Sequence, residues 1–76
     1  MSQELRKAVD RAVSTVNSHQ GETCVYLTFA DDAQEFDFMA SSARCEGEAF
    51  EFCSGCETIS GRVAEIRSIR AEIIAR

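Results

Sequence analysis

The stretch AFEFCSGCE, residues 49–57, decides the fold that the sequence predicts. Its first half alternates phenylalanine with glutamate, as a half-buried strand does. Its second half places Ser54 and Glu57 at capping-box spacing, which favours the first turn of a helix. Because the longest helical pattern of the chain follows, we predict that the chain changes from strand to helix here.

A helix that begins at Ser54 would collect large aliphatic side chains on one stripe. The stripe consists of Ile59, Val63, Ile66, Ile69 and Ile73. Arg70 would project into the middle of it, because each helical residue turns the chain by about 100°. We expect its guanidinium either to extend along the stripe to water or to pair with an acid of the sheet or of a second subunit.

The residues upstream predict a helix and an antiparallel sheet. The expected elements are a helix over residues 3–18, strands over 23–29, 34–40 and 48–52, and a polar loop over 41–47. Asp31 and Asp32 supply the turn of the first hairpin. The whole order predicts a small two-layer α+β domain, helix, three-stranded antiparallel meander and helix (αβββα), with both helices on the phenylalanine face of the sheet.

Length and composition restrict the class of protein. The 76 residues predict one domain, residues 1–76, with a thin core. Hydrophobic residues make up 45% and charged residues 28%, and no window approaches the ~20 apolar residues of a membrane span. The first residues read directly into an amphipathic helix without a signal-peptide pattern, so we expect a cytoplasmic protein with reduced cysteines.

Charge is distributed unevenly along the chain. The net charge of -5 argues against direct binding to nucleic acid, because there is no surplus of lysine and arginine to neutralise phosphates. Residues 20–61 hold nine acids and one base, whereas the flanking residues hold seven bases and four acids. The predicted sheet is therefore acidic, and the predicted helices are basic.

Strand alternation places acidic side chains on the sheet face opposite the phenylalanines. That face would hold Tyr26, Thr28, Glu35, Asp37 and Glu51, with Asp31, Asp32, Glu46 and Glu48 at its edges. One interpretation is a solvated face without a partner. The other is a docking surface for a protein partner with a basic surface, for example a nucleic-acid-binding protein whose phosphate-reading groove it occupies.

Four cysteines make a zinc-stabilised module an alternative, since four thiolates complete a tetrahedral structural site. The possible ligands are Cys24, Cys45, Cys53 and Cys56, with His19 as a substitute for Cys24. A strand over residues 48–52 rises about 3.3 Å per residue and would carry Cys45 and Cys53 to opposite ends of the sheet. The meander then predicts Cys24 near Cys45 and Cys53 near Cys56, so a single zinc site would need an irregular loop over residues 41–56.

A redox dithiol is the second alternative. A strand that leads into Cys53 and Cys56 at a helix start resembles the active-site turn of thioredoxin-like proteins, over residues 52–56. Such folds place a cis-proline beside the dithiol, and this chain contains no proline. Glu51 and Glu57 would also raise the pKa of a neighbouring thiol. The competing interpretation is that the thiols are buried or unreactive.

The residue inventory favours binding over catalysis. One histidine at a helix end and scattered glycines assemble no catalytic triad, phosphate loop or metal-hydrolase motif. We therefore expect a non-catalytic acidic adaptor or inhibitor of another macromolecule, with no cofactor, no membrane contact and a capacity to form a homodimer. Inhibitors that phages encode against host defence systems are one class of small acidic single-domain proteins.

Overall fold

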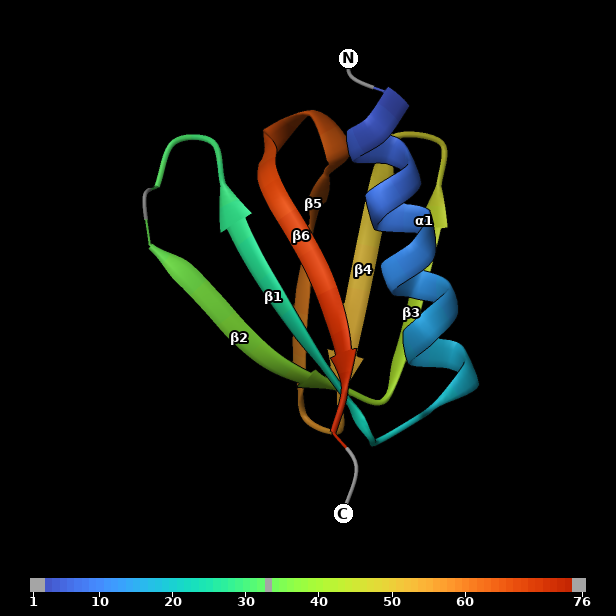
Figure 1. The fold of residues 1–76 in the computed structure, drawn as a ribbon. Coiled ribbons are helices and arrows are strands. Elements are labelled where there is room, and N and C mark those ends of the chain that lie inside the picture. Colours follow the sequence, from blue (N-terminus) through green and yellow to red (C-terminus); the bar gives the residue numbers. More distant parts are fainter. Residues whose placement is uncertain (1–2, 33, 75–76) are drawn as a thin grey trace.

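The computed structural model describes residues 3–32 and 34–74. Within these residues the chain forms one α-helix, six strands and a 3-10 turn (Figure 1). In chain order they are α1 (Gln3–Ser18), β1 (Thr23–Phe29), β2 (Glu35–Ala40), β3 (Ser42–Glu46), β4 (Ala49–Ser54), β5 (Glu57–Arg62), η1 (Val63–Glu65) and β6 (Ile66–Ile73). The α+β class is confirmed, but the predicted helix, three strands and helix are wrong, because six strands follow a single helix.

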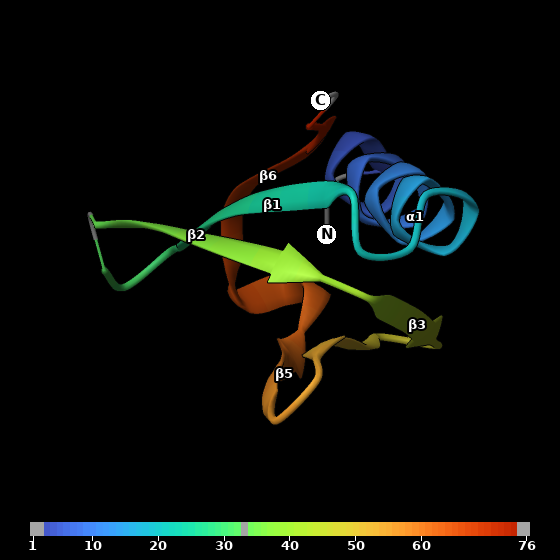
Figure 2. The same cartoon turned by 90° about the horizontal axis from the view of Figure 1, so that it is seen from below.

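The strands form two antiparallel sheets, ordered β2-β1-β6 and β3-β4-β5. The two sheets face each other, and α1 lies at one side, where it packs against β6 and β3 (Figures 1 and 2). We call the side of β2-β1-β6 that points away from the other sheet face A, and the corresponding side of β3-β4-β5 face B. Because the sheets share one core between them, faces A and B point in opposite directions.

The first helix and the first hairpin were predicted correctly. Val9, Ala12 and Val16 of α1 are buried, as their helical spacing requires. Val25 of β1 lies opposite Phe38 of β2 in antiparallel register. Alternation of apolar and polar side chains therefore indicated both elements and the faces that they bury.

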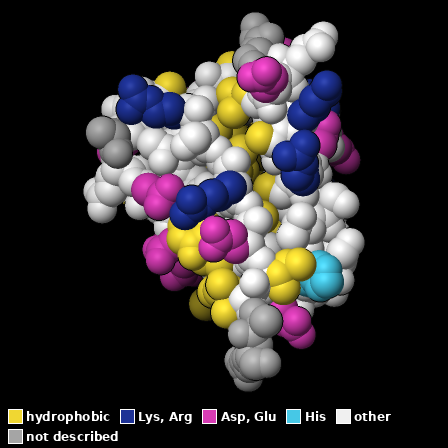
Figure 3. Space-filling view, viewed as in Figure 1, with side chains coloured by type: hydrophobic (Ala, Val, Ile, Leu, Met, Phe, Trp, Pro, Cys, Tyr) yellow, Lys and Arg dark blue, Asp and Glu magenta, His cyan; other side chains and the backbone are white. Residues whose placement is uncertain are grey.

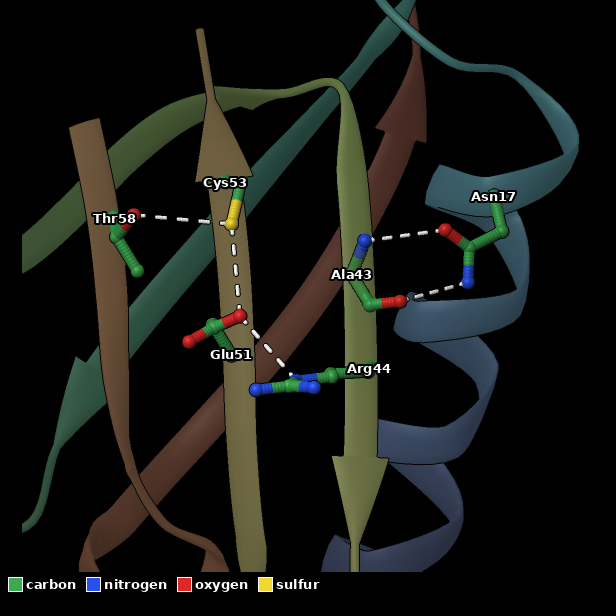
Figure 4. A network of polar contacts seen from close by, with 6 residues as sticks. All are labelled: Asn17, Ala43, Arg44, Glu51, Cys53 and Thr58. Atoms are coloured by element: carbon green, nitrogen blue, oxygen red, sulfur yellow. Dashed lines mark hydrogen bonds and ion pairs between the residues drawn. The ribbon is translucent and has the colours of Figure 1, made fainter. Parts of the chain in front are cut away.

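The loop predicted over residues 41–47 is wrong, because β3 occupies most of it as an edge strand. Its sequence is polar because Ser42, Arg44 and Glu46 point onto face B, which meets solvent, whereas Ala43 and Cys45 pack against the core. The side-chain amide of Asn17 donates to the carbonyl of Ala43 at 2.9 Å and accepts the N–H of Ala43 at 3.1 Å (Figure 4). A side chain of the helix thus takes the place of a neighbouring strand.

The final helix predicted from Ser54 is also wrong, because the chain turns back at Gly55 and forms β5 and β6. Ser54 and Glu57 lie opposite each other in the β4–β5 register, so they flank a two-residue hairpin turn and do not form a capping box. Gly55 has a φ of 61°, whereas Cys56 has no positive φ. Positive φ at the first central residue only is the pattern of a type II′ turn, which glycine adopts without strain.

The helical spacing of the C-terminal isoleucines has a different structural origin. Val63 lies in η1 and is fully buried. The β1–β6 register then shifts between Thr28 and Phe29, which marks an irregularity of the kind that a β-bulge produces. Because of this shift Ile66 and Ile69, three residues apart, both point into the core with 3% and 8% of their surface exposed. A 3-10 turn followed by a bulged strand therefore mimics the period of a helix.

The core lies between the two sheets and beneath α1. It contains Val9, Ala12, Val16, Val25, Leu27, Phe38, Ala40, Phe50, Phe52, Val63, Ile66 and Ile69. Phe50 and Phe52 share one face of β4, as predicted, and their ring centroids are 5.8 Å apart. Phe29 stacks on Phe50 at 6.5 Å, so aromatic contacts join the first sheet to the second. One helix, not two, covers the open side of this core.

Candidate partner-binding surface

Face A carries most of the acidic positions that the alternation predicts. The register places Tyr26 of β1 between Asp37 of β2 and Arg70 of β6, and it places Thr28 beside Glu35. In the described part of the chain no helix covers this face, because α1 packs at the β6 and β3 side of the molecule (Figure 2). In Figure 3, which looks onto face A, acidic side chains surround a basic one and border a hydrophobic patch.

Arg70 belongs to face A and not to an apolar helix stripe. Its guanidinium carbon lies 4.4 Å from the centroid of the Tyr26 ring, a cation–π contact. Its Nε also lies 3.9 Å from Oε1 of Glu72, so the expected ion pair with an acid of the sheet forms on β6 itself. Arg70 is therefore already engaged by an aromatic ring and a carboxylate.

Tyr26 presents a neutral hydroxyl at the middle of face A. The pKa of Tyr26 is raised above its ordinary value, first by a hydrogen bond with the Cys24 side chain and then by the electrostatic interaction with that side chain. The neighbouring Arg70 acts in the opposite direction, but its effect is smaller. The phenol therefore stays protonated at neutral pH and offers both a hydrogen bond and an aromatic surface.

Asp31 and Asp32 lie at the tip of the β1–β2 hairpin, which projects beyond the rest of the sheet (Figure 1). Asp32 has the predicted turn role, because its Oδ1 accepts the N–H of Gln34 at 3.0 Å and its own N–H donates to the carbonyl of Phe29 at 3.2 Å. Asp31 is exposed beside it. The tip thus extends the negative charge of Glu35 and Asp37 along the hairpin.

Glu51 does not share this face, which corrects the prediction that all the acids lie together. It points from β4 onto face B, where its Oε1 lies 3.3 Å from Nε of Arg44 (Figure 4). The thiol of Cys53 donates to the same oxygen at 3.7 Å and accepts a hydrogen bond from Thr58 Oγ1 at 3.7 Å. Glu51 is therefore part of a separate polar network on face B, in which Arg44 balances its negative charge.

The four cysteines are not brought together. Cys24 is buried on face A opposite Met39, and Cys45 lies opposite Phe50 at the far end of β3, so the predicted neighbourhood of Cys24 and Cys45 is wrong. Cys53 points onto face B, and Cys56 is exposed in the turn. Among residues 3–32 and 34–74, no group of three or more His, Cys, Asp or Glu side chains could hold a metal ion.

His19, considered as a zinc ligand, and Cys56, considered as part of a redox turn at a helix start, lie in different local structures. His19 closes α1, since its N–H donates to the carbonyl of Thr15 at 3.0 Å and its carbonyl accepts the Thr23 hydroxyl at 3.0 Å. Cys56 lies in a hairpin turn, so no helix dipole acts on its thiol. Burial raises the pKa of Cys45, which makes that thiol less reactive than an exposed one.

Comparisons with protein-family models, with curated proteins and with solved structures gave no match to this chain. The helix in the described part of the chain is too short and too polar to cross a membrane. Sequence reasoning identified Tyr26, Glu35 and Asp37 on face A. It missed Arg70 and Glu72, because their positions depend on β6 pairing with β1. The alternation of the predicted strand over residues 34–40 places Met39 on the same side as Glu35 and Asp37, although Met39 was not among the predicted site residues.

Proposed function

We propose that this chain is a non-catalytic binding protein whose face A docks onto a basic surface of another macromolecule. The observation that carries the proposal is the exposed row of Glu35 and Asp37 on β2, next to exposed Met39. Arg70 of β6, a cation on this face, contacts Tyr26 and pairs with Glu72 and not with that row. An uncovered sheet face with clustered carboxylates and an apolar patch is typical of a docking surface for a cationic partner.

A nucleic-acid-binding protein is the partner class that this charge pattern favours. Such proteins neutralise phosphates with clustered lysine and arginine side chains, and carboxylates spaced along a strand can occupy the same side chains. The chain would then act as an adaptor or an inhibitor that competes with nucleic acid. Long-range attraction between the two charged surfaces would speed the encounter and would make it sensitive to salt.

The test compares two double variants that each remove two charges. Glu35→Gln with Asp37→Asn neutralises face A, and Glu46→Gln with Glu48→Gln is the matched control at the β3–β4 end of the other sheet. Wild type and both variants are used to capture partners from an extract of the source cells, and the captured proteins are identified by mass spectrometry at low and high salt. We expect a basic partner that is lost with the face A variant and retained with the control. Equal capture by both variants would refute the proposal.

A further inference from the structure

We infer that the partner reaches face A as an extended strand that pairs with the free edge of β2 and carries basic side chains at alternate positions. This inference rests on the proposed function, because it specifies how the basic partner binds. Strand addition at an open sheet edge is a common mode of peptide recognition, in which backbone hydrogen bonds give affinity and alternate side chains give specificity.

The edge of β2 is open in the described part of the chain. β2 pairs with β1 on one side, and it is the outermost strand of its sheet. In both Figure 1 and Figure 2, no element runs alongside β2 on the side away from β1. Glu35, Phe36 and Asp37 are exposed, so the first half of the strand stands in solvent. An edge strand presents unpaired N–H and C=O groups, which a second strand can bond.

The side chains of β2 specify the chemistry of that second strand. Glu35, Asp37 and Met39 project from face A, two residues apart from one another, whereas Phe36 projects from the opposite side of the strand. A directly opposite residue on an added strand would lie about 4.5–5.5 Å away, between Cβ atoms. Lysine or arginine at alternate positions would therefore meet the two carboxylates.

Apolar contact is available on both sides of the same edge. Phe36 is 38% exposed and Met39 is 46% exposed, although large apolar side chains are usually buried. The Phe36 ring makes an edge-on contact with Phe29 at 6.2 Å, so it is held in place while one side of it faces solvent. The residues of an added strand that alternate with the basic ones would pack against this ring. The preferred partner segment thus alternates basic and apolar residues.

A second copy of this chain does not fit the β2 edge. Antiparallel pairing of two β2 strands with Phe36 opposite Phe36 would place Glu35 of each copy opposite Asp37 of the other, and like charges at directly opposite positions destabilise a sheet. The edge of β3 is occupied by the Asn17 amide. β5 is the edge strand of its own sheet, but its exposed side chains include no large apolar one. β6, the other edge strand of the β2-β1-β6 sheet, packs against α1. The acidic β2 edge therefore favours a basic strand from a partner.

The test uses synthetic peptides of eight residues. The first peptide alternates lysine and valine, and the second alternates glutamate and valine. Two further lysine–valine peptides are N-methylated at every second residue to remove backbone donors, one at its lysines and the other at its valines. Each is titrated into isotope-labelled protein, and amide shifts and amide hydrogen exchange are followed by NMR. We expect the lysine–valine peptide to shift and protect β2 amides, the glutamate–valine peptide not to bind, and at least one N-methylated peptide to bind at least tenfold more weakly.

Charge reversal supplies the matched control. Glu35→Lys with Asp37→Lys should exchange the preference, so that the glutamate–valine peptide binds and the lysine–valine peptide does not. Glu46→Lys with Glu48→Lys should leave the original preference unchanged. Equal binding of the N-methylated and parent peptides would overturn strand addition but leave docking of a basic surface intact. Amide shifts centred on β5 would also overturn strand addition at β2 without refuting the proposed function. The same conclusion would follow if the lysine–valine peptide did not bind while the protein still captured its basic partner. If the lysine–valine peptide does not bind, and the variant with Glu35→Gln and Asp37→Asn captures the same partners as its control variant, the proposed function is refuted as well.

Discussion

Replacement of Gly55 and Gly61 by alanine tests the fold by the sign of the stability change. Glycine in a helix interior is less stable than alanine by about 0.5–1 kcal/mol, so in a helix both substitutions would stabilise the protein. In the structure Gly55 has a φ of 61°. A side chain at such a φ costs about 1–3 kcal/mol, and the restricted unfolded chain returns about 0.4–1 kcal/mol. We therefore expect Gly55→Ala to destabilise the protein by about 1 kcal/mol or more.

Gly61 is sensitive for a different reason. A Cβ at this position would lie 3.3 Å from Cε2 and Cζ of Phe50 and 3.5 Å from Oε1 of Glu65. The Phe50 ring is buried and cannot easily move away, and overpacking of this kind costs typically about 1–3 kcal/mol. In a domain of this size, each 1 kcal/mol lowers Tm by about 4–8 °C.

Circular dichroism during heating and during urea titration measures both changes. Cys56→Ala is the control, because Cys56 is exposed in the same turn and has no positive φ, and its Tm should stay close to that of wild type. We expect a lower Tm for Gly55→Ala and for Gly61→Ala than for wild type. A higher Tm for both variants would refute the hairpin and support a helix through these residues.

Three further predictions concern packing, the strand edge and thiol chemistry. Phe52→Ala removes a ring with 1% of its surface exposed, so the free energy of unfolding in urea should fall by about 3–5 kcal/mol, whereas a loss below 1 kcal/mol would contradict the core. Asn17→Ala removes two exposed hydrogen bonds to Ala43 and should cost about 1 kcal/mol, with faster hydrogen exchange at the Ala43 amide as the specific readout. Cys45 should react with iodoacetamide more slowly than exposed Cys56 at pH 8, because burial raises the pKa of Cys45. The folded pKa of Cys45 lies above its unfolded value of about 8.5, so the stability that the protonated thiol contributes should be complete below that pH and should decline as the pH rises further. Cys45→Ala should make the decline smaller, while the part due to the raised pKa of Tyr26 remains, and an equal decline in the variant would disprove the assignment.

Local alternation predicted the elements whose pattern has a single structural explanation. The residues of α1 follow a helical period over four turns, and those of β1 and β2 alternate without interruption. The faces of Tyr26, Glu35 and Asp37 followed directly from that alternation. The placement of Glu51 failed for a non-local reason, because no pattern within β4 states that this strand belongs to a second sheet.

The C-terminal third failed because two structures share one sequence pattern. Apolar residues three apart are typical of a helix, but η1 and the irregular start of β6 produce the same spacing at Val63, Ile66 and Ile69. One local signal favoured the hairpin. Glycine occupies the first central position of both two-residue turns, Gly47 and Gly55, which is the composition of type II′ turns. The capping-box interpretation of Ser54 outweighed that signal.

The contact between Asn17 and Ala43 limits how this protein can assemble with itself. A sheet polymerises by adding strands at an edge, and each molecule that offers two compatible edges can extend a filament. The amide closes the β3 edge with a side chain, and the charges on β2 disfavour contact between like copies. We therefore expect Asn17 to oppose growth from the β3 edge, because its loss would leave the backbone groups of Ala43 open to a strand of another copy.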